Sequence, residues 1–174
     1  MNFIESFNNK TILIPLLQRD YVQGSKESAV ISPFLDALLE KECDLNYIYG
    51  YEEDGCFVPI DGQQRLTTLY LLHLYLYASK KQAKEYKVHM KFASREYAND
   101  FCERIVEHLE ELLSKSSSYK SLDEAIKDQN WFIMSWSKNA TVCNMLGTLK
   151  LVHHKVKNNV DTIWKRLVKS DIQV

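Results

Sequence analysis

The sequence lacks any paired cysteine motif. Its four cysteines, Cys43, Cys56, Cys102 and Cys143, lie far apart among 174 residues, and no C-x-x-C pair occurs. Structural zinc sites and disulfide frameworks depend on closely or regularly spaced cysteines, so neither is expected here. Reduced thiols are typical of the cytoplasm, which is the location we expect.

An excess of one charge sign is also missing. The chain has 22 Lys and Arg residues against 23 Asp and Glu residues, which gives a formal net charge of -1. Proteins that bind nucleic acid over a broad surface are usually basic, so the composition does not favour that class. A local basic patch remains compatible with this balance.

Long hydrophobic runs and targeting segments are absent as well. The longest apolar stretch, Leu66 to Ala78, is interrupted by His73 and several tyrosines. It is too short to span a bilayer and instead predicts a buried core helix, so no membrane partner is expected. The first 15 residues have no basic region followed by an apolar one, and we expect no signal peptide.

Local patterns predict a small sheet near the N-terminus. Asp54-Gly55 is a strong hairpin turn signal between two short β-rich stretches. β-branched or alternating apolar residues predict strands at Thr11–Ile14, Asn46–Tyr51, Cys56–Ile60 and residues 88–92.

Most of the remaining sequence has helical spacing. Apolar residues recur every three or four positions from Phe101 to Leu112, Ser121 to Glu124 has the form of a capping box, and a short helix is predicted over Val142–Leu151. We therefore expect an α+β fold with a small N-terminal sheet and a largely helical remainder. We expect residues 1–174 to form one domain of a longer protein, with the sheet in about 1–95 and the helical part in about 96–174.

The most informative stretch is Asp61-Gly-Gln-Gln-Arg65, between a strand and the apolar helix. The first N–H groups of a helix have no partner within the helix and attract anions. Gly62 can adopt a positive φ and let the backbone approach a ligand, and Arg65 can grip a phosphate with two hydrogen bonds. Asp61 could hold a hydrated Mg²⁺ or accept a proton from an attacking water.

Neighbouring polar residues extend this site. Gln63 and Gln64 can orient a water molecule, and the hydroxyls of Thr67 and Thr68 could reach phosphate oxygens. The chain has neither a Walker A lysine motif nor G-x-G-x-x-G, so a nucleotide site here would be neither a P-loop nor a Rossmann fold.

A purely structural interpretation of the turn stays open. Asp61 followed three residues later by Gln64 matches a capping box, with Asp61 as the N-cap. A capped helix end can still bind an anion, so the two interpretations are compatible.

A second polar cluster follows the first strand. Gln18, Arg19 and Tyr21 come shortly after Pro15. If the strands Thr11–Ile14 and Cys56–Ile60 are neighbours, both polar loops could open on one pocket. Arg19 and Arg65 would then offer two cations to a polyphosphate, and Tyr21 could stack on a base.

Two stretches resemble a known family. "IPLLQRDYVQG" and "DGQQRLTTLYLLHLYL" are similar to signature stretches in the N-terminal domain of GmrSD-type restriction proteins, of the ParB/sulfiredoxin-like superfamily. "KFASREYANDFCERIV" and "DQNWFIMSWSKNATVCNML" resemble later segments of that domain more loosely. The similarity reaches from about residue 10 to about residue 150. The DGQQR motif is its specific part.

The resemblance implies a nucleotide-binding domain that hydrolyses nucleoside triphosphates (NTPs) with Mg²⁺. The catalytic group would be Asp61, Gln63, Gln64 and Arg65, with Asp61 also at the metal. The nucleotide-binding group would comprise Gln18, Arg19, Tyr21, Gly62, Arg65, Thr67 and Thr68.

The resemblance further implies an HNH-type nuclease domain as partner, in the parent protein or in another chain, and DNA as the target of the full assembly. No His-Asn-His motif is present in this chain. The family's first signature often continues as Tyr-x-Trp, whereas Tyr21 is followed here by Val22 and Gln23. The alternatives are a ParB-like DNA-binding or nuclease module and a non-catalytic interaction scaffold.

Overall fold

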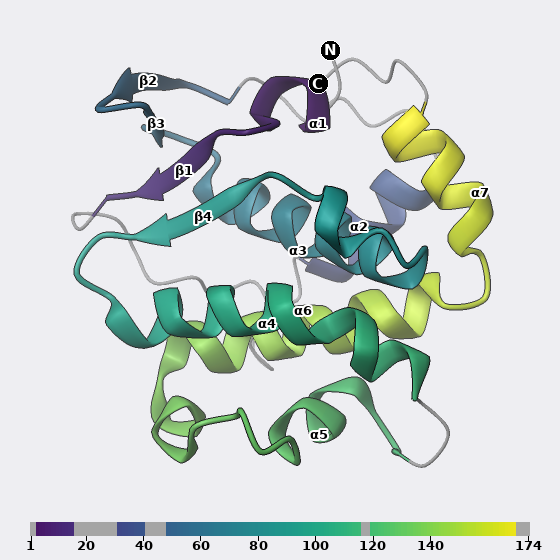
Figure 1. Ribbon diagram of the computed structural model, residues 1–174. Coiled ribbons are helices and arrows are strands. Elements are labelled where there is room, and N and C mark those ends of the chain that lie inside the picture. The colour runs from purple at the N-terminus through teal and green to yellow at the C-terminus, as the bar shows by residue number, and fades with distance from the viewer. Residues whose placement is uncertain (1–2, 16–30, 41–47, 116–118, 170–174) are drawn as a thin grey trace.

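The computed structural model describes residues 3–15, 31–40, 48–115 and 119–169 (Figure 1). Its strands are β1 (Thr11–Ile14), β2 (Gly50–Glu53), β3 (Cys56–Pro59) and β4 (His89–Phe92). Its α-helices are α1 (Phe3–Phe7), α2 (Ile31–Glu40), α3 (Gln63–Ser79), α4 (Glu96–Ser114), α5 (Leu122–Lys127), α6 (Ala140–Val156) and α7 (Val160–Trp164). Short 3-10 turns occur at Ala83–Glu85 and Met134–Lys138, and a π-helical turn at Lys165–Lys169 follows α7. The expected mixed fold, a small sheet with a largely helical remainder, is confirmed.

The four strands form one mixed sheet in the order β2-β3-β1-β4. β1 pairs in parallel with β3 on one side and with β4 on the other, while β2 is antiparallel to β3. The strands expected to be neighbours, at Thr11–Ile14 and in the hairpin, therefore are neighbours. Because β3, β1 and β4 are parallel, their carboxyl ends meet at one edge of the sheet.

The predicted hairpin is confirmed. Asp54 and Gly55 both have positive φ angles, 48° and 76°. Two consecutive residues with positive φ produce a type I′ turn, whose twist matches that of the strands it joins. The first strand begins at Gly50, later than the expected Asn46, which lies outside the described residues.

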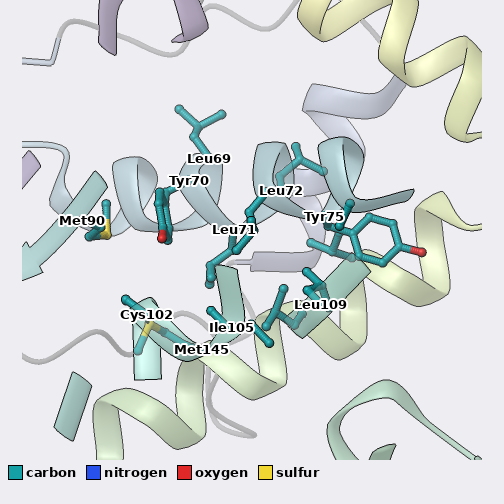
Figure 2. Packing of buried hydrophobic residues seen from close by; sticks show 14 of the residues in the cluster. Leu69, Tyr70, Leu71, Leu72, Tyr75, Met90, Cys102, Ile105, Leu109 and Met145 are labelled. Atoms are coloured by element: carbon teal, nitrogen blue, oxygen red, sulfur yellow. Dashed lines mark hydrogen bonds between the residues drawn. The ribbon is translucent and has the colours of Figure 1, made fainter. Parts of the chain in front are cut away.

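Helix α3 is the centre of the fold, as its composition predicts. Every residue from Leu66 to Ala78 is buried, because α3 lies between the sheet and helices α4 and α6 (Figure 1). Figure 2 shows the side chain of Leu71 directed toward Ile105 of α4. A helix that is apolar on all sides must be covered by neighbouring elements on all sides, and this position provides that cover.

Helix α6 is longer than predicted. It begins at Ala140 because Asn139 caps it, with the Asn139 Oδ1 accepting a hydrogen bond of 3.0 Å from the Val142 N–H. It then continues through Gly147 to Val156. Ser121 is the N-cap residue of α5, as expected, but its side chain makes no capping hydrogen bond. Within the described ranges, no helix has the length and apolar character needed to cross a membrane.

Candidate functional site

The turn between β3 and α3 is held by backbone contacts. The N–H groups of Ile60 and Asp61 both donate to the carbonyl of Tyr49, at 2.7 and 3.2 Å. Gly62 has a φ of 82°, in the left-handed region. A Cβ at this position would lie 3.0 Å from Ile48 Cγ1 and 3.3 Å from the Arg65 Nη2. The expectation that Gly62 adopts a positive φ is confirmed, and the close contacts add a steric reason for glycine.

The predicted capping box is wrong. The N-cap residue of α3 is Gly62, not Asp61, and glycine has no side chain with which to cap. The Asp61 carboxylate instead accepts a hydrogen bond from the Arg65 guanidinium at 3.1 Å, one helical turn away. Because Gly62 has a positive φ, the helix begins one residue later than the capping-box pattern predicts. The Asp61 carboxylate forms an ion pair with Arg65 instead of capping the helix.

The pair differs in exposure. The Asp61 side chain is 70% exposed, and that of Arg65 is 22% exposed. An ion pair with one exposed member contributes little to stability, since water competes for both charges. The exposed Asp61 carboxylate can therefore turn toward a ligand at small energetic cost.

The other predicted side chains of this turn are mostly buried. The Gln63 amide donates to the Pro59 carbonyl at 3.3 Å and is 8% exposed as a residue. The hydroxyls of Thr67 and Thr68 donate to the carbonyls of Gln63 and Gln64, at 2.9 and 3.0 Å. These bonds fix the first turn of α3. Gln64 is half-buried.

The chain leaves the three parallel strands at the same edge of the sheet. The Asp61–Arg65 turn follows β3, the chain leaves β1 through Pro15, and residues 93–95 follow β4. Ligands of open α/β sheets bind outside the carboxyl ends of parallel strands. Gln18, Arg19 and Tyr21, expected to form the second wall, lie outside the described residues.

Arg95 is a residue at this edge that the sequence analysis did not select. Its guanidinium carbon lies 6.0 Å from the centre of the Phe92 ring, and the side chain is half-buried. Asn99 fixes the loop, since it accepts from the Phe92 N–H at 2.7 Å and donates to the Phe92 carbonyl at 3.0 Å. The alternation of residues 88–92 predicts the strand, but only its parallel pairing with β1 places Arg95 beside the other loops.

A buried histidine inside α3 takes no part in this edge. His73 is 2% exposed, stacks on the Phe3 ring with centroids 4.6 Å apart, and its Nδ1 lies 2.8 Å from the Leu69 carbonyl. Burial lowers the pKa of His73 to about 4, although the carbonyls of Leu69 and Leu167 oppose the shift. His73 is therefore a neutral part of the core at physiological pH.

The turn offers one carboxylate to a metal ion. Mg²⁺ keeps most of its water and is held by one or two carboxylates together with substrate phosphates, so the exposed Asp61 fits this role. Across the described ranges, no three His, Cys, Asp or Glu side chains gather closely enough to hold a metal ion by themselves.

Comparison with known families identifies the class of protein. The family model of the N-terminal domain of the GmrSD restriction endonuclease matches residues 3–170. The chain belongs to this family, and it is accordingly a restriction or defence protein of a nuclease-associated, DNA-acting kind. Neither the curated proteins nor the solved structures gave a match.

Proposed function

We propose that the chain binds a nucleoside triphosphate at the carboxyl edge of its sheet and hydrolyses it, as a regulatory domain of a DNA restriction system. The observation that carries the proposal is the Asp61–Arg65 turn. It combines a glycine with positive φ, a helix N-terminus and an arginine paired with an exposed aspartate. This combination suits an anion with several phosphates.

Each residue of the turn has a distinct part in the proposed reaction. Arg65 and the first N–H groups of α3 hold the phosphates, and Gly62 lets the backbone approach them. Gln63, Thr67 and Thr68 are positioning residues, because their hydrogen bonds fix the turn rather than point outward. If Gln18, Arg19 and Tyr21 join the pocket, they add a cation for the phosphates and a ring for the base.

Hydrolysis requires a positioned water. Asp61 or Gln64 would orient a water molecule toward the γ-phosphorus, and Asp61 would hold Mg²⁺, which neutralises phosphate charge when bound. A bond forms between the water oxygen and the γ-phosphorus while the bond to the β–γ bridging oxygen breaks. The products are a nucleoside diphosphate, inorganic phosphate and a proton. We further propose that the partner is an HNH-type nuclease domain in the same protein or in another chain.

The test is thermal stability with each NTP and Mg²⁺, for wild type, Arg65→Ala and Arg104→Ala. Arg104 is an exposed arginine of α4 that pairs with Glu107, so it is a matched control. A ligand that binds only the folded state stabilises it by about 2.7 kcal/mol at a hundredfold excess over Kd. For a chain of this size, that corresponds to roughly 5–10 °C in Tm.

We expect a shift in wild type and in Arg104→Ala that is lost in Arg65→Ala. Phosphate release by the wild type, abolished in Asp61→Asn, would then support hydrolysis. A folded wild type that responds to no nucleotide would contradict the proposal and leave an interaction scaffold as the better description.

A further inference from the structure

A groove of about 1020 Å³ lies on the helical side of the molecule, and its described lining includes no residue of the Asp61–Arg65 turn or of residues 93–95. It is bordered by the start of α2, by Leu112 of α4, by residues 119–127 including α5, and by α6 from Cys143 to its C-terminal end. Its floor is apolar and includes Leu122 and Leu146. Gly147 of α6 also lines the groove.

The described residues that line the groove are strongly biased toward positive charge. They include four lysines and one aspartate, hence three positive charges in excess, whereas the whole chain has a net charge of -1. The lysines are exposed residues and are Lys120, Lys127, Lys150 and Lys157. The aspartate, Asp123, forms an ion pair with Lys150 at 3.3 Å.

The charges are spread along the groove rather than gathered at one point. Lys150, His153, His154 and Lys157 follow one another at helical spacing from α6 onward, over roughly 10 Å at 1.5 Å per residue. Lys120 and Lys127 stand on the opposite wall, at the two ends of α5. Such an arrangement suits an anion with several phosphates in a row better than a single phosphate group.

The field of these cations acts on the groove's own histidine. Burial, together with the charges of Lys157 and His154, lowers the pKa of His153. His153 is anchored from behind, since its Nδ1 lies 2.9 Å from the Tyr75 hydroxyl. A bound phosphate chain would relieve this repulsion between like charges.

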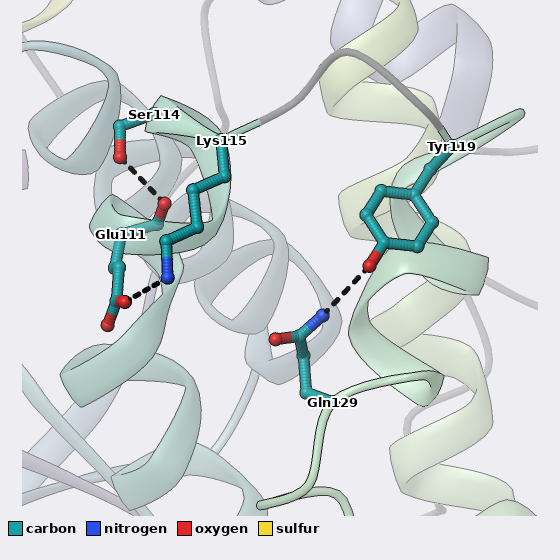
Figure 3. A network of polar contacts seen from close by, with 5 residues as sticks. All are labelled: Glu111, Ser114, Lys115, Tyr119 and Gln129. Atoms are coloured by element: carbon teal, nitrogen blue, oxygen red, sulfur yellow. Dashed lines mark hydrogen bonds and ion pairs between the residues drawn. The ribbon is translucent and has the colours of Figure 1, made fainter.

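An aromatic ring stands at the rim. Tyr119 is 41% exposed, and its hydroxyl accepts a hydrogen bond of 3.5 Å from the Gln129 amide (Figure 3). The same amide donates to the Ala125 carbonyl at 2.9 Å, which ties the ring to the end of α5. Exposed aromatic rings beside a positive groove are typical of surfaces on which bases stack.

We propose that this groove binds the sugar-phosphate backbone of DNA, independently of the nucleotide site at the sheet edge. Lysines serve as phosphate contacts because they are compact, mobile point charges. DNA is favoured over an acidic peptide because the lysines are spread along the length of the groove and the Tyr119 ring is exposed beside them. Membership in a restriction family agrees with this choice.

The test is fluorescence anisotropy of the full 174-residue chain with a labelled DNA duplex and with its separate strands, at several salt concentrations. The variants are K120Q/K127Q/K157Q and, as the control, K84Q/K87Q/K91Q. All six lysines are exposed, and the control set is outside the groove. Both variants lose three charges, so a general electrostatic effect would weaken both equally.

We expect the wild type to bind DNA with an affinity that falls roughly 40-fold between 50 and 200 mM salt, the change for about three phosphate contacts. The groove variant should bind DNA at least roughly tenfold more weakly than the wild type. Its affinity should change little with salt concentration. The control variant should behave as the wild type, and poly-glutamate should compete poorly. Preference for the duplex or for a single strand identifies the form of DNA that the groove takes.

Three results would overturn the proposal. These are the absence of DNA binding at 50 mM salt, an equal loss in the two variants, and poly-glutamate competing as well as unlabelled DNA. The last result would indicate an acidic protein partner instead. Because none of the groove lysines belongs to the Asp61–Arg65 turn or to residues 93–95, nucleotide-dependent thermal shifts remain a separate measurement, and failure of one proposal is distinguishable from failure of the other.

Discussion

Gly62 and Gly55 have nearly the same backbone conformation in different surroundings. Their φ angles are 82° and 76°, but a Cβ at Gly62 would contact Ile48 and Arg65, whereas a Cβ at Gly55 would meet nothing within 4 Å. A non-glycine residue in the left-handed region costs about 1–2 kcal/mol. Gly55→Ala should therefore lower the free energy of unfolding by about that amount.

Gly62→Ala should cost more, about 2–4 kcal/mol, since crowding adds to the same backbone strain. Urea denaturation of both variants measures the difference. Equal costs would show that the turn relaxes around a methyl group, and the steric argument for glycine at the site would be wrong.

His73 should make the protein less stable in mild acid. Its pKa is about 4 in the folded state, against an ordinary value of 6.5. Between these values the unfolded state binds the proton more strongly, so the contribution of the neutral ring is present above the unfolded pKa and is lost as pH falls toward 4. At pH 5 the loss relative to pH 7 is about 2 kcal/mol.

The measurement is the free energy of unfolding at pH 7 and pH 5 for the wild type and His73→Leu. Other groups affect both proteins alike, so the difference between the two pH values should be smaller in the variant by about 2 kcal/mol. Parallel pH profiles would show that His73 is not the group responsible.

At the scale of elements, Asn99 joins α4 to the end of β4. Its side chain satisfies both the N–H and the carbonyl of the buried Phe92, at 2.7 and 3.0 Å. Asn99→Ala leaves both groups without this partner and should cost about 2 kcal/mol. Asn99→Asp keeps the acceptor and loses the donor, so its cost should be intermediate.

Hydrogen exchange locates the effect of these two changes. Amides of β4 and of the first turn of α4 should lose protection in Asn99→Ala, while those of the hairpin at Asp54-Gly55 should not. Uniform loss of protection would indicate that the two elements unfold only together with the rest of the chain.

The same elements show how far sequence reasoning reaches. The hairpin and α3 are predictable because their signals are local. The hairpin turn requires two consecutive positive φ angles, which Asp54-Gly55 can adopt. A helix that is apolar on every side must be buried. The capping-box interpretation of Asp61 and Gln64 is wrong, because the capping pattern cannot show that Asp61 pairs with Arg65 instead. Ion pairs and caps compete for the same carboxylate.

Pairing between distant strands had no local signal. The register joins Thr11 to His89 and Thr11 to Cys56, and these contacts cross much of the chain. Without knowledge of that pairing, the sequence shows only that Arg95 precedes a helix and does not place it near the Asp61–Arg65 turn. The candidate site could be predicted at the Asp61–Arg65 turn but not on the β4 side.

At the scale of the whole molecule, the parallel strands bring residues from separate parts of the chain to one edge. β1 lies between β3 and β4, and adjacent strands are about 4.8 Å apart, so the loops after β3 and β4 begin roughly 10 Å apart. Two arginines can approach one triphosphate across such a distance. If one ligand occupies this edge, Arg65 and Arg95 should depend on each other in binding it.

A double-mutant cycle on NTP affinity tests this dependence. Arg65→Ala and Arg95→Ala should each weaken binding about 10- to 100-fold, as expected for hydrogen bonds to a charged group, and Arg95→Lys should retain part of the affinity. Because both side chains would contact the same phosphates, their effects should depart from additivity by about 0.5 kcal/mol or more. Thermal stability without ligand separates a folding defect of Arg95→Ala from a binding defect. Strictly additive losses, or an unchanged affinity in Arg95→Ala, would confine the nucleotide site to the β3 and β1 loops.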